Sequence, residues 1–399
     1  MLLRSTLEAV LRAPVLPSPP DPEVPRALAS TVALRPSHAT VLTGVRRCGK
    51  STLQAQLMRS AGRAVYASFE DTRLFGFGPD DFSSFISVVG EIGGAGTPVF
   101  LDEVQEAPDW PRLVRALLDQ GRATCVTGSN ASLLGREVGT RLTGRHLSFE
   151  VFPFSYAEYL TFTGQAPGPA SFRAFLDDGG FPAFLGLGQD VVLQTLLRDV
   201  VQRDVAARHG LRETRHVMNL ALFLLANTGQ PLSLQTLTKS LAVPTVGQTS
   251  RYVEHLLDAY LLFAVPRFST SVKQRVVAPP KYYAVDNGLR RANSVQTQPD
   301  VGHRLENAVA LHLRRHTPAL SYAGERGLWE CDFVTPDASI QVCMELTPTN
   351  RNRELRGAVE GARLRGRRRG LVITLDQADR LVEDGVAIEV VPAWRWMTE

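Results

Sequence analysis

The sequence has few cysteines and no long apolar run, and both absences exclude classes of protein. Its 399 residues include four cysteines, and no two of them have CxxC spacing, which argues against a zinc ribbon or a redox pair. The four are Cys48, Cys125, Cys331 and Cys343. Few, scattered cysteines are typical of a reducing compartment, so we expect a cytoplasmic protein. No apolar stretch is long enough to span a bilayer, and Arg4 and Glu8 interrupt the N-terminal apolar residues. We therefore expect neither a membrane partner nor a signal peptide.

The composition is not extreme in charge or hydropathy. Hydrophobic residues make up 44% of the chain and charged residues 21%, as in ordinary globular proteins. A chain of 399 residues predicts two to four domains. The net charge of +4 permits a nucleic-acid partner without requiring one. Arginines are concentrated between residues 351 and 369, where we expect one helix. These arginines can form either a phosphate-binding face or a solvated helix surface.

Short apolar runs alternate with helical patterns from residue 38 to about residue 160. The runs HATVLTG, RAVYASFE, TPVFLDE and ATCVTGS predict strands, and the segments between them predict amphipathic helices. This alternation indicates a parallel sheet with helices on both faces. A Pro-rich stretch, residues 14–25, precedes the sheet and separates it from a short N-terminal helix, so we expect a linker or strap there.

Residues 44–51, GVRRCGKS, match the phosphate-binding pattern GxxxxGK[ST] between a predicted strand and a predicted helix. Gly44 and Gly49 let the backbone curl so that successive N–H groups point at phosphate oxygens. Lys50, which we expect to face solvent in the empty loop, supplies charge for the β- and γ-phosphates, and Ser51 offers a hydroxyl to Mg²⁺. The predicted ATP-binding residues are Gly44, Val45, Arg46, Arg47, Cys48, Gly49, Lys50, Ser51 and Thr52.

Polar side chains end two further predicted strands. Asp102 and Glu103 follow a buried apolar run, at the strand end where open α/β sheets place their ligands. We expect Asp102 to hold Mg²⁺ with Ser51, and Glu103 to polarise the attacking water. Asn130, at the end of the next strand, is predicted to orient that water, although Gly-Ser-Asn is also ordinary turn chemistry.

Two arginines in the string TRLTGRH are candidates for a catalytic role between subunits. An arginine near a domain edge can stabilise transition-state charge at a neighbour's nucleotide. We name Arg145 as the candidate in a homo-oligomer, with Arg141 as the alternative. A plain surface arginine is an equally good interpretation of either residue.

The strings GVRRCGKST, FLDEVQ, TGSNASLL and LTGRHLSFEVFPFSYAEYL together resemble prokaryotic AAA-type (AAA+) ATPases that carry a C-terminal domain of unknown function. The similarity continues through GGFPAFL, RYVEHLLDAYLLF, YYAVDNGLR and ECDFV, and so covers nearly the whole chain after the Pro-rich stretch. The resemblance implies an ATPase core, a helical lid, a winged helix and a C-terminal domain similar to PD-(D/E)XK nucleases.

The predicted fold is therefore α/β: a P-loop NTPase core of the AAA type, a helical lid and winged helix, and a smaller restriction-endonuclease-like domain. Two amphipathic segments joined by a turn at residues 243–245 favour the winged helix, although another small helical lid shows the same pattern. The predicted boundaries are 1–25 for the helix and linker, 26–165 for the ATPase domain, 166–228 for the lid, 229–270 for the winged helix and 271–399 for the C-terminal domain.

The C-terminal domain departs from the nuclease pattern that it resembles. Such a site uses a helix-borne Glu, an Asp on a strand, and an acid and a Lys two residues apart on the next strand. Glu306 and Asp332 match the first two positions, but Gln341 and Cys343 stand at the others. A neutral amide and a thiol replace neither the carboxylate that binds Mg²⁺ nor the lysine that orients water. Glu345 is an alternative acid that also lacks a lysine, so we predict a nuclease-like fold without nuclease activity.

The sequence thus predicts an AAA-type molecular switch or remodeller that hydrolyses ATP with Mg²⁺ and engages DNA through the winged helix and the C-terminal domain. Two alternatives remain open. One is an ATP-gated DNA-binding regulator with slow turnover, and the other is an ATP-dependent nuclease.

Overall fold

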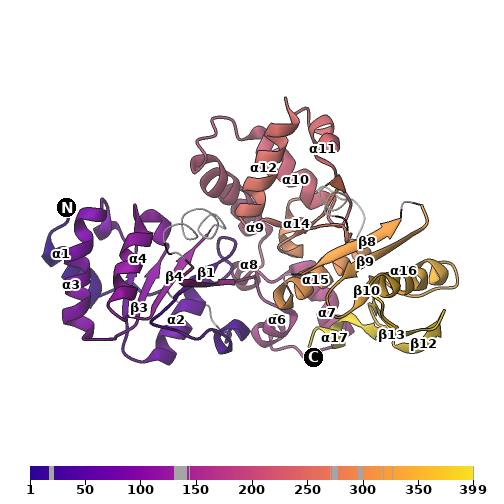
Figure 1. The fold of residues 1–399 in the computed structure, drawn as a ribbon, viewed down its shortest axis with the longest axis horizontal. Helices are drawn as coiled ribbons and strands as arrows, with labels where there is room; N and C mark the ends of the chain where they lie inside the picture. The colour runs from indigo at the N-terminus through magenta and orange to yellow at the C-terminus, as the bar shows by residue number, and fades with distance from the viewer. Residues whose placement is uncertain are drawn as a thin grey trace. The chain divides into compact units, whose positions relative to one another are not determined.

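A computed structural model gives the fold of the chain (Figure 1). The structure describes residues 1–17, 22–129, 142, 144–269, 271, 277–294, 300–317, 319–325 and 327–398. The chain divides into two compact units. The first is Met1–Phe152 with Asp258–Tyr260, and the second is Pro153–Leu257 with Leu261–Glu399.

The first unit is built on a five-stranded sheet in the order β2-β3-β4-β1-β5, in which every neighbouring pair is parallel. The strands are β1 (Ala39–Thr43), β2 (Val65–Ser68), β3 (Val99–Asp102), β4 (Thr124–Gly128) and β5 (His146–Glu150). The predicted parallel sheet is confirmed, with β5 as an edge strand that the sequence patterns did not identify. Because β4 lies between β1 and β3, its carboxyl end lies between the loops that follow those two strands.

Helices and short 3-10 turns connect these strands. The helices are α1 (Arg4–Arg12), α2 (Lys50–Ala61), α3 (Phe82–Gly93) and α4 (Trp110–Asp119), and the turns are η1 (Ala27–Ser30), η2 (Thr72–Leu74), η3 (Pro79–Asp81) and η4 (Val104–Glu106). The N-terminal helix α1 packs against α3 and buries Leu7, Val10 and Leu11 in the same apolar cluster as the sheet residues. It is thus an integral part of the first unit and does not stand apart from it.

The second unit begins with helices. They are α6 (Tyr156–Thr163), α7 (Pro169–Asp178), α8 (Pro182–Leu187), α9 (Asp190–Asp199), the π-helix η6 (Val200–Ala207) and α10 (Arg215–Ala226). Next come α11 (Leu234–Ser240), α12 (Val246–Asp258) and an antiparallel pair of strands, β6 (Leu262–Val265) and β7 (Lys281–Ala284). Two short helices joined by a turn and followed by an antiparallel strand pair have the element order of a winged helix.

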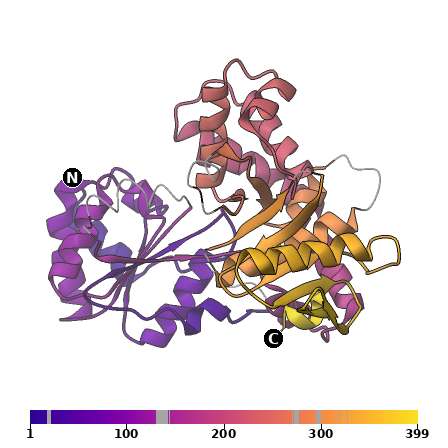
Figure 2. The ribbon, with the colours of Figure 1, turned by 45° about the vertical axis from the view of Figure 1, so that its right-hand side comes forward.

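A six-stranded mixed sheet follows in the order β12-β13-β11-β10-β9-β8. Its strands are β8 (Ser321–Glu325), β9 (Trp329–Val334), β10 (Ser339–Val342), β11 (Arg369–Thr374), β12 (Asp379–Glu383) and β13 (Val386–Pro392). The helices of this part are α14 (Asn287–Ala292), α15 (Val301–His316), α16 (Arg351–Leu364) and α17 (Ala393–Trp396). Helix α16 packs across β9, β10 and β11 (Figure 2).

The arginine-rich segment is only partly helical. Helix α16 ends at Leu364, so Arg365, Arg367 and Arg368 lie in the turn after it, and Arg369 begins β11. The prediction of one continuous Arg-rich helix is therefore wrong. Gly366, with a φ of 64°, reverses the chain into the strand. Within the described residues, no helix combines the length and the apolar character needed to cross a membrane.

Candidate nucleotide site

The loop between β1 and α2 has the backbone that a phosphate loop requires. Gly44 has a φ of 144° and Gly49 a φ of 101°, both in the region that favours glycine. A Cβ atom at Gly44 would lie 2.1 Å from the carbonyl oxygen of Val151, so a side chain does not fit there. Helix α2 begins at Lys50, directly after the loop, and its free N–H groups and dipole favour an anion at this point.

Lys50 is buried, with 4% of its surface exposed, and the expectation that it faces solvent is wrong. Its Nζ atom donates to the carbonyl oxygens of Gly44 at 3.1 Å and Val45 at 3.2 Å. The curled loop points these two carbonyl oxygens at the ammonium group of Lys50. Their hydrogen bonds take the place of those that the ammonium group would make with water. The positive charge of Lys50 is therefore held at the loop itself.

The other predicted loop residues divide by exposure. The side chains of Val45 and Cys48 are buried, so these two residues offer only backbone groups to a ligand. Burial also raises the pKa of the Cys48 thiol. Arg47 is exposed, whereas Arg46 and Thr52 are half-buried.

The two predicted Mg²⁺ ligands lie together at the carboxyl edge of the sheet. Ser51 Oγ donates to Asp102 Oδ1 at 3.1 Å. Asp102 also accepts hydrogen bonds from Thr127 Oγ1 and, at 3.1 Å, from the hydroxyl of Tyr66. Burial raises the pKa of Asp102, whereas the bonds from Thr127, Ser51 and Tyr66 act in the opposite direction. Thr127 and Tyr66 belong to no sequence motif and were not predicted; they reach Asp102 from the two strands that flank β3.

Glu103 follows Asp102 with an unusual backbone, φ 50° and ψ 50°. Its N–H donates to Thr127 Oγ1 at 2.9 Å, and its Oε2 accepts a hydrogen bond from Gln105 Nε2. A third acid, Glu70, follows the neighbouring strand β2; desolvation and the Glu103 carboxylate raise its pKa. Glu70 was identifiable from the sequence, because an acid after a buried strand is the signal that identified Asp102.

Of the remaining candidates for a catalytic role, the structure describes only Arg145. Asn130 and Arg141 lie outside the described residues, and Ser129 is buried at the end of β4. Arg145 precedes β5, next to the start of β1, whereas the phosphate loop follows the end of β1. Its Nη1 atom pairs with Asp119 Oδ1 at 2.6 Å. Because β1 and β5 are parallel, Arg145 lies at the amino ends of the strands, and the phosphate loop lies at their carboxyl ends. A role for Arg145 at a bound nucleotide therefore requires the nucleotide site of a second copy of the chain.

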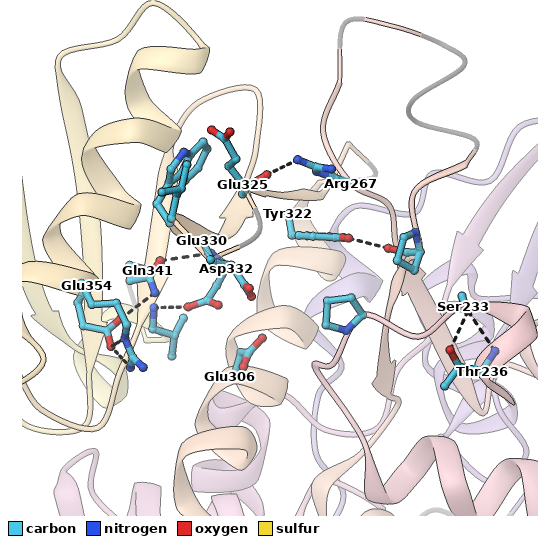
Figure 3. A pocket seen from close by; sticks show the side chains of 18 residues that line it. Ser233, Thr236, Arg267, Glu306, Tyr322, Glu325, Glu330, Asp332, Gln341 and Glu354 are labelled. Atoms are coloured by element: carbon cyan, nitrogen blue, oxygen red, sulfur yellow. Dashed lines mark hydrogen bonds and ion pairs between the residues drawn. The ribbon is translucent and has the colours of Figure 1, made fainter. Parts of the chain in front are cut away.

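The second unit contains a pocket of about 1070 Å³ that the predicted nuclease positions line in part (Figure 3). Glu306 of α15, Asp332 of β9 and Gln341 of β10 all contribute to its wall. Cys343 does not, because its side chain packs in the apolar cluster beneath α16. Gln341 is held on both sides of its amide: Oε1 accepts from the Asp332 N–H at 3.3 Å, and Nε2 donates to Glu354 at 2.7 Å.

Lys281 of β7, which was not predicted to belong to this site, places its ammonium group among three of the pocket acids. Its Nζ atom lies 3.3 Å from Glu306 Oε1, 2.6 Å from Glu330 Oε1 and 3.3 Å from Asp332 Oδ1. Burial, together with the Glu306 carboxylate, raises the pKa of Asp332 to about 7. Among the described residues, no group of three or more His, Cys, Asp or Glu side chains is arranged to hold a metal ion. Three acids of this pocket, Glu306, Glu330 and Asp332, are thus paired with a buried ammonium group.

Comparisons with known families match two parts of the chain. Residues 36–160 match the family model of an AAA domain, and residues 170–300 match a domain of unknown function (DUF8612). The first match contains the phosphate loop and both acids of β3. Together with the parallel sheet, it supports a P-loop NTPase fold for this part of the chain. Neither match reaches the mixed sheet, so the likeness of residues 271–399 to PD-(D/E)XK nucleases stays a prediction.

The chain is also similar to curated proteins over most of its length. It is 28% identical over 405 residues to uncharacterized protein MJ1544 of Methanocaldococcus jannaschii, which covers 92% of this chain and 89% of that protein. It is 29% identical over 334 residues to an uncharacterized protein of Haemophilus influenzae, which covers 77% of this chain and 82% of that protein.

Two solved structures show distant likeness. The replication initiator DnaA bound to AMPPCP and single-stranded DNA has 12% identity and a TM-score of 0.26, covering 58% of this chain and 85% of that chain. Cdc6p from Pyrobaculum aerophilum has 11% identity and a TM-score of 0.27, covering 66% of this chain and 91% of that chain. These TM-scores are too low to bear on fold or function.

Proposed function

We propose that this protein binds ATP with Mg²⁺ and hydrolyses it, as an AAA-type molecular switch or remodeller that engages DNA. The meeting of Ser51 and Asp102 at the carboxyl edge of the parallel sheet carries this proposal. The charge of Lys50 is held at the adjoining loop, and Glu103 is the next residue after Asp102. The match of residues 36–160 to an AAA domain supports the same function.

The loop N–H groups, the start of α2 and Lys50 bind the phosphates of ATP, because all three present positive charge to one place. The Ser51 hydroxyl and the Asp102 carboxylate are oxygen donors of the kind that Mg²⁺ prefers, and Mg²⁺ supplies charge neutralisation to the phosphates when bound. Hydrogen bonds from Thr127 and Tyr66 hold the buried Asp102 carboxylate in place.

Glu103 is the general base of the proposed hydrolysis. Its carboxylate accepts a proton from water as the water oxygen bonds to the γ-phosphorus. The bond between that phosphorus and the β–γ bridging oxygen breaks, and the products are ADP and phosphate. Arg145 of a second copy is proposed to stabilise the transition-state charge, in keeping with its place at the far edge of its own sheet.

Lys50→Ala tests the binding step. We expect the affinity for ATP in the presence of Mg²⁺ to fall at least about tenfold, because a charge-assisted contact to the phosphates is lost. Lys239→Ala on the exposed face of α11 removes the same side chain away from the loop and should leave binding unchanged. Titration of each purified variant with ATP gives the two affinities. An unchanged affinity in Lys50→Ala would remove the basis of the proposal.

The proposal of DNA engagement rests on two features of the second unit. The order α11, turn, α12 and strand pair β6–β7 supports a winged helix, which docks on duplex DNA in other proteins. Exposed arginines at Arg356, Arg365 and Arg368 provide charge for backbone phosphates. We further propose that the mixed-sheet pocket does not cleave DNA, because Gln341 and Cys343 stand at the places of the second acid and the lysine of the nuclease pattern.

A further inference from the structure

The carboxylate of Glu103 is held by a side chain that the proposed hydrolysis does not use. Gln105 lies two residues further along, in the 3-10 turn η4, and its Nε2 atom donates to Glu103 Oε2. The N–H of Glu103 is fixed at the same time, because it donates to Thr127 Oγ1 at 2.9 Å. Both ends of the proposed base are therefore restrained in the resting protein.

Two features of this arrangement are energetically unfavourable: the backbone of Glu103 and the amide oxygen of Gln105. Glu103 has a left-handed backbone, φ 50° and ψ 50°, which a non-glycine residue rarely adopts and which tends to occur at functional sites. Gln105 Oε1 is buried and has no hydrogen-bond partner among the described residues. A buried amide oxygen without a donor is unfavourable, so the amide gains if it turns to a new partner. The contact between Gln105 and Glu103 is thus suited to being broken.

The neighbouring charges explain why the amide binds Glu103 at all. The Glu103 carboxylate lies close enough to Glu70 and Asp102 to raise the pKa of both. An N–H donor on Glu103 Oε2 offsets part of this repulsion. That donor also takes one lone pair of Oε2 and fixes the orientation of the carboxylate, so this oxygen is less available to the attacking water.

We propose that Gln105 is a positioning residue that restrains hydrolysis: its amide holds Glu103 Oε2 in the resting protein and releases it before the attacking water is activated. The inference rests on the proposed ATPase function. The contact that restrains hydrolysis then lies in the turn η4, two residues after the proposed base. Any event that offers Gln105 another partner, such as nucleotide binding or contact with a second copy, raises turnover.

Gln105→Met tests the proposal, because methionine keeps the size of the side chain and removes the donor. Turnover of saturating ATP should rise about tenfold, the size of change that loss of a hydrogen bond to a charged group brings. ATP affinity should stay at its wild-type value. Gln189→Met, at an exposed position before α9, is the matched control and should match wild type in both measurements.

A double variant separates positioning from a merely structural role. In the Glu103→Gln background the proposed base is absent, so Gln105→Met should no longer change the residual turnover. Turnover that stays the same or falls in Gln105→Met, in a protein with wild-type thermal stability and ATP affinity, would overturn the restraint. A rise that persists without Glu103 would overturn it too. Wild type that neither binds nor hydrolyses ATP would instead contradict the proposed function.

Discussion

Lys281 should contribute strongly to the stability of the second unit. Its side chain is 2% exposed and pairs with Glu306, Glu330 and Asp332. Lys281→Met leaves these acids without a cation, and breaking a buried ion pair in this way is destabilising by about 3–5 kcal/mol. We expect the free energy of unfolding, measured with urea at neutral pH, to fall by that amount. Lys239→Met on exposed α11 is the control, and its stability should be unchanged.

The loss should depend on pH in a defined direction. The folded-state pKa of Asp332 is about 7, above the ordinary value of a carboxyl group. As pH falls through 7, the folded chain binds a proton that the unfolded chain binds only near pH 4, so this group favours folding more at lower pH. Without Lys281 the pKa of Asp332 should rise further. The difference between Lys281→Met and wild type should therefore shrink between pH 8 and pH 5, and a difference that is constant over this range would contradict the account.

At the scale of residues, the sequence could predict those site residues that stand close together in one motif. Gly44, Lys50 and Ser51 stand in one short pattern, and in the structure Ser51 Oγ donates to Asp102. Lys281 could not be assigned to its pocket, because 51 residues separate it from Asp332 and only the tertiary fold joins them. The burial of Lys50 was also beyond the pattern, since it depends on the direction of two loop carbonyl groups.

Two turns interlock in the second unit, the turn between α7 and α8 and the turn between β7 and α14. Asp286 accepts hydrogen bonds from the N–H of Gly180 at 2.6 Å and the N–H of Leu289 at 2.8 Å. A Cβ atom at Gly288 would lie 2.0 Å from the carbonyl oxygen of Asp178. The two glycine-containing strings GGFPAFL and YYAVDNGLR are thus parts of one structural contact.

Gly288→Ala should break this contact. The added methyl group meets backbone on the facing turn, and overpacking of this kind is destabilising by about 1–3 kcal/mol or more. Gly186→Ala, within α8, meets no atom within 4 Å and should be neutral or slightly stabilising, as alanine is in a helix. Urea unfolding of both variants checks this. Equal stabilities would show that the two turns do not need this close approach.

The sequence predicted which helices and strands exist better than it predicted the residues at which they begin and end. The strands and helices between residues 38 and 128 follow the predicted alternation, because buried parallel strands have continuous apolar sequences. Strand β5 was missed, since its edge position leaves Leu147 and Ser148 exposed. The α16 helix ends earlier than predicted, because Gly366 takes a backbone conformation that a helix cannot include.

At the scale of the whole molecule, the contacts within the chain place residues 1–152 in the first unit and α6 in the second, whereas the domain boundary at residue 165 stays a prediction. The contacts group α6 with the second unit, since Tyr156 and Tyr159 pack on Phe172 and Phe175 of α7. Sequence similarity to an AAA domain extends to residue 160, so the sequence match and the contact grouping end at different residues. Packing between helices of different segments is not visible in a local sequence pattern.

DNA binding is tested by its dependence on salt. If the arginines after α16 contact phosphates, affinity for duplex DNA should fall steeply as salt rises. Reversing Arg365, Arg368 and Arg369 to Glu should reduce the slope of log affinity against log salt by about 2–3. The control reverses three exposed arginines elsewhere, and its slope should stay near the wild-type value. These are Arg112, Arg115 and Arg380.

The same samples test the absence of cleavage. Supercoiled plasmid incubated with the protein, ATP and Mg²⁺ or Mn²⁺ should stay intact, because Gln341 and Cys343 replace the second acid and the lysine of the nuclease pattern. Nicking that disappears in Asp332→Ala would favour the ATP-dependent nuclease. No binding to DNA at low salt would point to a protein partner for the arginine surface.

The central claim is that this protein hydrolyses ATP with Glu103 as the base, and the turnover of Glu103→Gln measures it most directly. Glutamine keeps the shape of the side chain and cannot accept the proton from water. We predict that Glu103→Gln binds ATP as tightly as wild type and releases phosphate at least about a hundredfold more slowly, in line with the usual contribution of a general base. Phosphate release at the wild-type rate by this variant, from protein free of contaminating ATPase, would contradict the account.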